Sequence, residues 1–589
     1  MASQGRLRTF VSQWWPCLLL VCAFWAVRYW HSAEFGLYED DLTHLPAAAA
    51  MSGRELIRFL VDPERYLRLY GQGHPLHYTF IYLFTNLGWR LGDLTGPYRI
   101  GFLIEALNIL LFFSLLKRIH SRALALMGSL VYVLYSADTT QAYLTFALGL
   151  QPSLTLLLLA SHAYLSGKRW MAYPLAALTL LTYETCYPVF VAIPWLITGP
   201  RRPQRRTLLA HVLILGLILV AMILWRLAAE DDRVAGLNSL RSLLSVPVLH
   251  MLQGPPVSLG TYIYRPVQAV LALNTEVVLV TIIALAVWLG ISRLLDLGRP
   301  ARLEEGLLLA WAEIRQRTGL RDRTRRFWGQ LPVQVRDLLR TALAGLAMLI
   351  LAYPLTFTVR AYAISGRDTR VHAAAVIGAA VLLGAVLLLV MWFARSSRWR
   401  GAADIVLGLW IGLLAAYGFV IQRDYRLAWE YQKAFWSDLV VLLPDLQEAT
   451  SILVDPSGLK DTRQIGANYW NLPVVLEQLY EFPPEWRRPP WVYRLADGWQ
   501  SLILADDGNL SLDAATTFTP PSNHGLTDPG NTVLIETFGD RLRRVGGPLQ
   551  LGEAQVQLRP VPQVLGEPAY TQGFLYPYLL GERAAPGSD

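Results

Sequence analysis

Apolar runs long enough to cross a lipid bilayer recur along the first 421 residues of this 589-residue chain. A spanning helix needs about 20 mostly apolar residues, because it rises about 1.5 Å per residue across a hydrocarbon core of about 30 Å. Hydrophobic residues make up 54% of the sequence and charged residues only 16%, whereas a soluble domain averages about 25% charged residues. We therefore predict a membrane all-α domain over residues 1–421.

Eleven stretches are candidate spans by length and composition. Two of them, Met171–Thr185 and Pro188–Ile197, are short, and we expect a broken pair that meets near the outer face. The full set is Gln13–Trp30, Tyr98–Leu116, Ala123–Tyr135, Ala142–Leu165, Met171–Thr185, Pro188–Ile197, Leu208–Leu227, Ala269–Ile291, Leu343–Val359, Val371–Phe393 and Ile405–Ile421.

Loop charges indicate the orientation. If Leu76–Leu91 lies in the outer interface instead of spanning, the basic loops, including the Arg-rich segment Arg293–Arg340, share the side of Arg6 and Arg8. Because basic residues concentrate in cytoplasmic loops, this arrangement is favoured. We expect a multi-pass protein of a bacterial inner membrane or plasma membrane, with a cytoplasmic N-terminus. Ala47–Leu60 reads as a further surface helix, with Met51, Leu56, Ile57 and Leu60 toward lipid.

The composition changes after Ile421. Arg426–Leu446 reads as a helix leaving the membrane, and no further spanning run follows. Short β-like runs then alternate with turn signals such as Asp455-Pro456 and Asp507-Gly508. Residues 422–589 are thus predicted to form an extracytoplasmic α/β or α+β domain with strands at Ser451–Val454, Trp491–Arg494, Ser501–Ala505 and Thr532–Glu536.

Three consecutive carboxylates, Glu39, Asp40 and Asp41, follow the first predicted span. Charged residues are common just beyond a spanning helix, so a solvated loop is the plain alternative. Mutual repulsion and partial burial raise the pKa of one member of such a cluster, which suits a general base. The same cluster is also a candidate ligand set for a divalent cation.

Two further acids are predicted near the same face. Asp138 follows a predicted span in SADTTQAY, where a loop or cap role is the alternative. Glu184 lies in the apolar stretch LLTYETCYPVF next to Tyr183. An ionisable residue at membrane depth is costly and therefore a functional candidate, although a structural hydrogen bond would also explain it.

A basic segment comes directly before the predicted span at Val371–Phe393. It contains Arg360, Arg367, Arg370 and His372, and it is predicted to face the outer side. Guanidinium groups there could hold a lipid phosphate, or could simply contact headgroups. His74 precedes Pro75 in GQGHPLHY, which alone would be a turn signal.

The sequence gives little support for metal, nucleotide-dependent or nucleophilic catalysis. The three cysteines give neither a disulfide framework nor metal-ligand spacing, and no Walker loop, GxSxG, HExxH or GxGxxG motif occurs. Tryptophans of the C-terminal region are candidates for stacking on sugars, although such residues are more often core: Trp470, Trp486, Trp491 and Trp499.

Taken together, these features resemble the GT-C superfamily of polyprenyl-phosphate-sugar-dependent glycosyltransferases, which includes protein O-mannosyltransferases and aminoarabinose transferases. The resemblance covers roughly Trp14 to Ile421. It lies in the acids of Tyr38-Glu39-Asp40-Asp41, the long first outer loop, the GQGHPLHYTFIYLF stretch and Tyr183-Glu184 at a helix break. The chain departs from the family in having His74 before Pro75 and an acid triplet instead of a pair.

The resemblance implies an inverting hexosyl- or pentosyltransferase of the cell envelope that uses a lipid-linked sugar donor and a glycan, lipid or protein acceptor. Asp40 or Asp41 would be the catalytic base. Arg370, with His372, would stabilise the leaving phosphate. Glu39, His74, Asp138, Tyr183 and Glu184 would help to bind or orient substrate. The resemblance implies no certain cofactor, and the acids are a candidate ligand set for a divalent cation.

Two other functions remain open at this point. A transporter or flippase of a lipid-linked glycan would also place acids along a pathway, but it predicts charges spread through the depth of several helices. A non-catalytic membrane scaffold would tolerate the loss of every acid named above.

Overall fold

The computed structural model describes residues 2–62, 74–140, 143–197, 204–228, 240–294, 331–356, 360–394, 399–455, 459, 472–495, 502–505, 508–512, 526–539, 541–551 and 553–581. Contacts divide the chain into two compact units. The first, here called the helical unit, comprises Met1–Ala33 and Gly53–Gln422. The second, the sheet unit, comprises Glu34–Ser52 and Arg423–Asp589. The acidic residues 39–41 therefore cluster with the C-terminal region and not with the helices that flank them in sequence.

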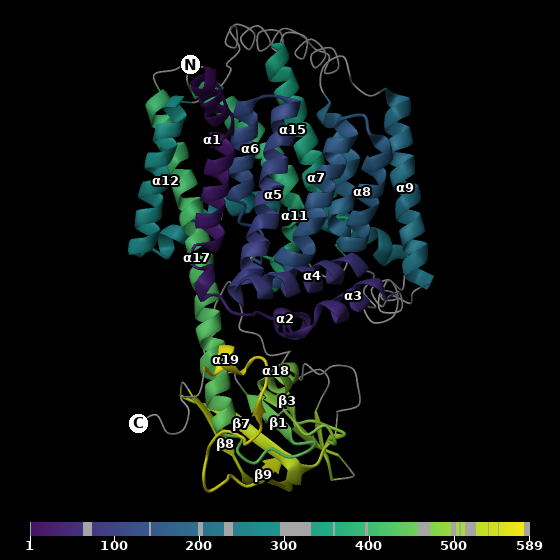
Figure 1. Cartoon of the computed structure of the whole chain (residues 1–589), viewed down its shortest axis with the longest axis vertical. Helices are drawn as coiled ribbons and strands as arrows, with labels where there is room; N and C mark the ends of the chain where they lie inside the picture. Colours follow the sequence, from purple (N-terminus) through teal and green to yellow (C-terminus); the bar gives the residue numbers. More distant parts are fainter. Residues whose placement is uncertain are drawn as a thin grey trace. The chain divides into compact units, whose positions relative to one another are not determined.

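Long helices form the body of the helical unit, and several of them run side by side in Figure 1, among them α5, α6, α7, α8 and α15. The elements are α1 (Ala2–Tyr29), α3 (Gly53–Val61), α4 (Pro75–Gly92), α5 (Thr95–Ile119), α6 (Arg122–Val133), the π-helix η3 (Phe146–Leu150), α7 (Gln151–Leu165), α8 (Arg169–Thr182), the 3-10 helix η4 (Glu184–Leu196), α9 (Arg205–Ala228), α11 (Leu240–Leu271), α12 (Thr275–Leu294), α15 (Val333–Leu351), the 3-10 helix η6 (Arg367–His372), α16 (Ala375–Ala394) and α17 (Arg400–Val441), whose last part belongs to the sheet unit.

Six of the described helices are long and apolar enough to cross a membrane, which is consistent with a membrane protein. They are Thr95–Ile119, Phe146–Leu165, Arg205–Leu227, Thr275–Arg293, Ala375–Ala394 and Arg400–Val441. The eleven predicted spans are not shown. The predicted run Ala123–Tyr135 forms a helix of only 12 residues, and Pro188–Ile197 lies largely in a 3-10 helix that contains Pro188 and Pro194. Proline removes a backbone donor and disfavours an α-helix at such positions.

Glycines allow close packing of α16 against its neighbours. A Cβ at Gly378 of α16 would lie 2.2 Å from the backbone nitrogen of Leu349 in α15. A Cβ at Gly384 would lie 2.5 Å from the Cα of Gly128 in α6. Small residues of this kind are typical where membrane helices approach each other closely. The seams between α15, α16 and α6 thus form a rigid centre for the loops at their ends.

The helix α4 runs across the bundle and not along it (Figure 1), as expected for a helix lying in the interface. The predicted single helix Ala47–Leu60 is wrong, because the chain is extended at Met51 between α2 (Asp41–Ala50) and α3. Leu56, predicted to face lipid, is buried instead, while Ile57 and Val61 are exposed. Phe59 of α3 stacks on Tyr82 of α4 with ring centroids 4.2 Å apart, which fixes α3 to α4.

The sheet unit contains a mixed four-stranded sheet of order β3-β1-β7-β8. Strands β3 and β7 both pair in parallel with β1, and β8 pairs antiparallel with β7. The four predicted β-like runs are confirmed as β1, β3, β4 and β7. The described elements are η1 (Ser32–Glu34), α2, β1 (Ser451–Asp455), α18 (Leu472–Leu479), β2 (Tyr480–Glu481), β3 (Trp491–Arg494), β4 (Leu502–Leu504), β5 (Leu510–Leu512), β6 (Leu526–Thr527), η8 (Pro529–Asn531), β7 (Thr532–Phe538), β8 (Arg541–Val545), β9 (Gly547–Leu551), β10 (Ala554–Leu558), β11 (Thr571–Gln572) and α19 (Tyr576–Leu579).

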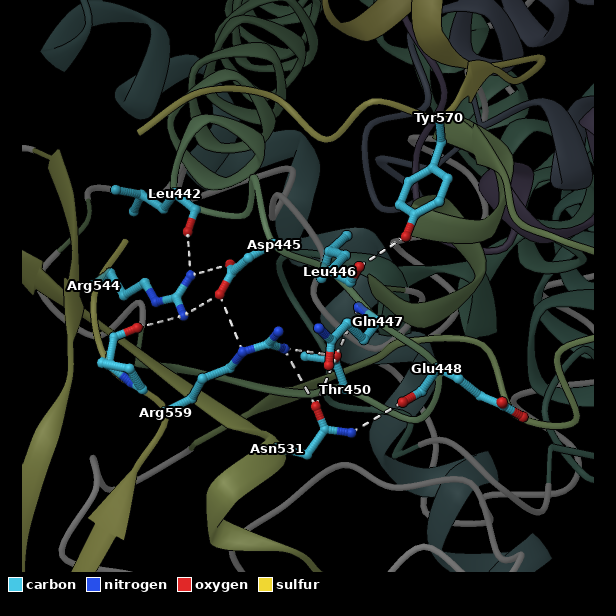
Figure 2. Close-up of polar contacts among 11 residues, drawn as sticks. Leu442, Asp445, Leu446, Gln447, Glu448, Thr450, Asn531, Arg544, Arg559 and Tyr570 are labelled. Atoms are coloured by element: carbon cyan, nitrogen blue, oxygen red, sulfur yellow. Dashed lines mark hydrogen bonds and ion pairs between the residues drawn. The ribbon is translucent and has the colours of Figure 1, made fainter. Parts of the chain in front are cut away.

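A polar network joins the segment that follows α17 to this sheet (Figure 2). Arg544 of β8 holds both carboxylate oxygens of Asp445, at 2.6 and 3.0 Å, and also donates to the carbonyls of Leu442 and Pro560. The Nε of Arg559 lies 3.1 Å from Asp445 Oδ2. Burial alone would raise the pKa of Asp445, but the hydrogen bonds and charges of the two arginines outweigh burial and lower it.

Some sequence predictions lie outside the described residues. These are Trp470, Trp499 and most of the basic segment Arg293–Arg340. The half-buried Trp486 stacks on Phe482 with centroids 5.6 Å apart and meets Tyr570 edge-on, while Trp491 lies in β3. Because both contacts cover the ring of Trp486, its packing does not support a role in stacking on sugars.

Candidate functional site

The acidic turn Glu39-Asp40-Asp41 opens α2 in the sheet unit. Asp41 is fully buried, and its Oδ2 accepts the backbone N–H of Tyr38 at 3.2 Å. Glu39 has a φ of 51°, a left-handed conformation that is uncommon for a residue with a side chain. Asp40 is half-buried and reaches solvent. Of the two predicted bases, Asp40 is therefore the one that a solvent-side acceptor can approach.

The turn is fixed to the sheet-unit part of α17. The Tyr38 hydroxyl donates to the carbonyl of Tyr425 at 2.8 Å and accepts from the N–H of Gly36 at 3.1 Å. A Cβ at Gly36 would lie 1.8 Å from the Trp429 ring, so only glycine fits there. Burial raises the pKa of Tyr38 well above its usual range, so this phenol stays neutral and structural.

A second cluster lies in the helical unit, around the loop that follows α6. Asp138 is only 2% exposed, and its Oδ1 accepts both the backbone N–H and the hydroxyl of Thr140, at 2.8 and 2.7 Å. No described residue donates a hydrogen bond to Oδ2. Burial raises the pKa of Asp138, whereas the bonds from Thr140 and the charges of Arg28 and Arg370 lower it. The two arginines are thus near enough to act on the carboxylate.

These arginines have largely unused donors. Arg28, at the end of α1, is 7% exposed and donates one hydrogen bond, to the carbonyl of Tyr135, within the described part of the chain. Arg370 of η6 is half-buried, and its guanidinium lies 5.4 Å from the Phe146 ring centroid. It makes no hydrogen bond to any described residue. A guanidinium carries five N–H donors, so this cluster has many to offer.

Hydrogen bonds hold η6 against the Asp138 loop. The Thr369 hydroxyl meets both the N–H and the hydroxyl of Thr139 at 3.0 Å. His372 is fully buried. Its Nδ1 lies 2.8 Å from the Tyr353 hydroxyl and its Nε2 lies 2.8 Å from the Ala363 carbonyl, which requires the proton on Nε2. The imidazole thus positions η6 and thereby Arg370.

The arginines at the edge of this segment are used differently. Arg360 is exposed and bonds the Tyr362 hydroxyl at 2.5 Å. Arg265 of α11 is 1% exposed, donates to the carbonyl of Ile364 and lies 4.6 Å from the Tyr417 ring centroid. Arg265 therefore fastens the Arg360–Gly366 loop to α11.

A third cluster joins His74, Tyr183 and Glu184, all predicted as substrate-binding residues. The Nε2 of His74 lies 3.1 Å from Glu184 Oε2, and its ring stacks on Tyr183 with centroids 5.7 Å apart. Arg226, at the end of α9, reaches Glu184 at 3.4 Å and His74 Nδ1 at 3.3 Å. Since Arg226 can only donate, Nδ1 accepts and the His74 proton lies on Nε2, facing Glu184.

The π-helix η3 lies between the second and third clusters. Its first residue, Phe146, contacts Arg370. A Cβ at Gly149 would lie 2.5 Å from the His77 ring, and His77 in turn lies 6.0 Å from Tyr183. Short π-helical segments occur often at functional sites. The π-helix η3 thus contacts both clusters of the helical unit. One cluster contains Asp138 and Arg370, and the other contains His74, Tyr183 and Glu184.

Sequence reasoning missed Arg28 and Arg226. Each ends an apolar helix on the side that the predicted topology makes extracytoplasmic, where basic residues are under-represented. A basic residue at the extracytoplasmic end of an apolar helix is an exception to that rule, and this exception was the signal in the sequence that could have identified both arginines. Among the described residues, no group of three or more His, Cys, Asp or Glu side chains is placed to hold a metal ion.

Fold and site together define an α-helical protein consistent with a membrane location, with a mixed-sheet unit and buried polar clusters at loops between its helices. Comparisons of the chain with family models, with curated proteins and with solved structures give no match.

Proposed function

We propose that this protein is a membrane glycosyltransferase that moves a sugar from a polyprenyl-phosphate donor to an acceptor hydroxyl on the extracytoplasmic face. The observation that carries the proposal is the cluster of Arg28, Asp138 and Arg370. One buried and one half-buried guanidinium with unused donors, in a helical unit with membrane-length helices, suit a phosphate that is attached to a lipid.

We further propose that helices beyond the six long apolar ones also cross the membrane. Trp14 and Trp30 of the α1 region are 53% and 60% exposed. Their 16-residue separation corresponds to about 24 Å of helix. Trp170 and Trp195, at the two ends of the α8–η4 pair, are also exposed. Tryptophan is enriched at both membrane–water interfaces, so these side chains fit two aromatic belts.

In the reaction, Arg370 stabilises the leaving phosphate. Negative charge builds on this phosphate as the bond to the anomeric carbon breaks, and a fixed guanidinium offers two parallel donors to it. The buried Tyr353–His372–Ala363 bonds hold η6 in place, so Arg370 needs no rearrangement to act. Asp138 balances the positive charge of the arginines while the site is without substrate.

In the sheet unit, Asp41 holds the acidic turn through the N–H of Tyr38, and Asp40 stays the predicted base for the acceptor hydroxyl. The hydroxyl oxygen then attacks the anomeric carbon with inversion, and the phosphate lipid leaves. Tyr183, stacked beside His74, offers an aromatic face to a sugar ring, and the His74–Glu184–Arg226 contacts fix its surroundings.

The proposal is tested with purified protein in nanodiscs, a polyprenyl-phosphate donor carrying a labelled sugar, and a membrane extract as the acceptor source. Asp40→Asn removes the basicity and keeps the size, so transfer should fall by about 10² or more. Thr43→Ser, on the same helix, is the matched control and should keep parental transfer. Parental transfer by an Asp40→Asn/Asp41→Asn double variant would remove the acidic turn from the mechanism.

A further inference from the structure

Basic side chains gather at one end of the helical unit, where the ends of α5 and α7 meet the starts of α8 and α9. Arg118, near the end of α5, donates to the Ser166 hydroxyl just after α7 at 2.8 Å. Ring contacts bring α9 to the same place, since His211 lies 4.9 Å from Tyr164 of α7. The helix α6 runs from this end toward the Asp138 loop, so these cations lie at the opposite end of α6 from the candidate site.

The exposed cations of this end have no acidic residues beside them in sequence. The stretches Lys117–Arg122, Leu165–Met171 and Gln204–His211 contain no Asp or Glu. Arg169 is exposed, and its guanidinium lies 5.7 Å from the Tyr164 ring centroid. Four further side chains are exposed and make no hydrogen bond or ion pair with any described residue. Together with Arg169 they are here called the basic end: Lys117, Lys168, Arg205 and Arg206.

Two titratable groups next to the basic end do not cancel its charge. His211 is 1% exposed, its Nε2 donates to the Phe190 carbonyl at 3.3 Å, and its Nδ1 lies 3.2 Å from the Tyr173 hydroxyl. A neutral imidazole satisfies both contacts. Asp337 of α15, which acts on this end, is paired with Arg340 at 3.3 Å. The positive charges therefore repel one another, and an anion would relieve that repulsion.

An exposed apolar surface continues from the basic end along α9, which lies at the edge of the helical unit in Figure 1. Leu209, Leu213 and Leu217 follow one another at four-residue spacing and are 62%, 58% and 71% exposed, whereas Leu215 is buried. Trp170, the second residue of α8, is 76% exposed. Tryptophan is enriched at the level of lipid headgroups. Cations at the head of an apolar face suit an anionic amphiphile better than a soluble anion.

We propose that the start of α8 and the start of α9 bind an anionic phospholipid. Lys168, Arg205 and Arg206 surround its phosphodiester headgroup, and its acyl chains lie along the exposed face of α9. Charge complementarity selects this occupant, because anionic headgroups bind basic sites at the ends of membrane helices. The site is distinct from the proposed catalytic clusters, and its occupation does not depend on sugar transfer.

Binding is measured on the full-length protein in nanodiscs that contain equal amounts of phosphatidylglycerol and phosphatidylcholine with the same acyl chains. Native mass spectrometry gives the ratio of the two lipids that the protein retains. A Lys or Arg near an anionic headgroup raises affinity by about fivefold. The parent should therefore retain phosphatidylglycerol over phosphatidylcholine by about tenfold or more.

The triple variant Lys168→Gln/Arg205→Gln/Arg206→Gln should lower this ratio by about tenfold or more. Its unfolding temperature in pure phosphatidylcholine should match that of the parent, because the three side chains have no partner to lose among the described residues. Raising the salt concentration should lower the parental ratio, since exposed charges are screened.

The matched control is Arg54→Gln/Arg58→Gln/Arg99→Gln. It removes the same charge from exposed arginines of α3 and of the first turns of α5, which are far along α5 from the basic end, and it should keep the parental ratio. Glycerophosphoglycerol, the headgroup without acyl chains, tests a soluble anion as the source. It should not displace the lipid at similar concentrations.

A parental ratio in the folded Lys168→Gln/Arg205→Gln/Arg206→Gln variant would overturn the assignment. Equal retention of the two lipids by the parent, or an equal loss in the control variant, would overturn it too, because attraction would then be absent or general. Displacement by glycerophosphoglycerol would mean that the site binds soluble anions and not a lipid. A loss confined to the first variant would support the site, whether or not the protein transfers sugar.

Discussion

The two units differ in how fully their arginines use their hydrogen-bond donors. In the sheet unit, Arg544 makes four hydrogen bonds through its two Nη atoms, and both oxygens of its partner Asp445 are bonded (Figure 2). In the helical unit, Arg28 makes one hydrogen bond to the described residues and Arg370 makes none. Only one carboxylate oxygen of Asp138 accepts hydrogen bonds from them. A closed network holds a fold together, whereas an open one has donors left for a ligand. The predictions below test that contrast.

The largest expected effect is on stability, at Arg544. Replacing it with methionine leaves the half-buried Asp445 with fewer partners, and breaking an ion pair with a buried partner destabilises by up to about 3–5 kcal/mol. Chemical or thermal unfolding followed by sheet-unit proteolysis measures this. Arg543→Met is the control, because Arg543 is 54% exposed, and its ion pair with Glu536 and its contact with the Phe538 ring lie at the surface. Similar unfolding midpoints for the two variants would contradict a structural role for the network.

The next effect is on catalysis, at Arg370. Arg370→Ala should lower sugar transfer by about 2–4 kcal/mol of transition-state stabilisation, as for other preorganised anion contacts. Its unfolding temperature should stay close to that of the parent, because the guanidinium makes no hydrogen bond to any described residue. Asp368→Ala, at an exposed neighbour, should transfer sugar normally. A drop in stability without a drop in transfer would make Arg370 structural.

The stability of the sheet unit should depend on pH through Asp445. The pKa of Asp445 is lowered in the folded state, so its contribution is complete above the usual carboxylate pKa of about 3.9. It is lost as pH falls through the lower, folded value. Unfolding of the sheet unit should therefore become easier below about pH 4, and Asp445→Asn should flatten that part of the curve. An unchanged pH profile in Asp445→Asn would show that other groups control acid unfolding.

The smallest effect separates a bonded hydroxyl from an unbonded one. Thr369→Val removes the contacts with Thr139 and should destabilise by about 1 kcal/mol or somewhat more. The Ser136 hydroxyl has no hydrogen-bond partner among the described residues, so Ser136→Ala should stay within about 0.5 kcal/mol of the parent. Thermal unfolding in nanodiscs measures both. The reverse order of stability would mean that Ser136, and not Thr369, holds the loop.

Local patterns in the sequence predicted much of this structure. Apolar length predicted the six long helices, and turn signals predicted β1, β3, β4 and β7. Helix breaks and acids at apolar positions pointed to Asp138 and Glu184. These features depend on neighbouring residues, so a single sequence contains them. The helix break at Met51 had a local signal in the dipeptide Ser52-Gly53, which the apolar periodicity of Ala47–Leu60 outweighed in the prediction.

Contacts between distant residues could not be predicted in the same way. Tyr38 bonds Tyr425, which lies 387 residues away, and this pairing is part of what assigns the acidic turn to the sheet unit. Arg28 was missed because it reads as an ordinary flank of the first span. Its significance depends on Tyr135 and Asp138, which only the fold brings to it. Arg226 likewise gains its meaning from His74 and Glu184.

We propose that the arginines of the helical unit with unused donors bind a lipid phosphate. This is tested by the affinity of Arg370→Ala and of the parent for a phosphonate analogue of the donor, in the same nanodiscs and at matched folded fractions. We expect affinity at least about tenfold weaker in Arg370→Ala, with an unchanged unfolding temperature. Equal affinity in the two proteins would contradict it and place the phosphate elsewhere.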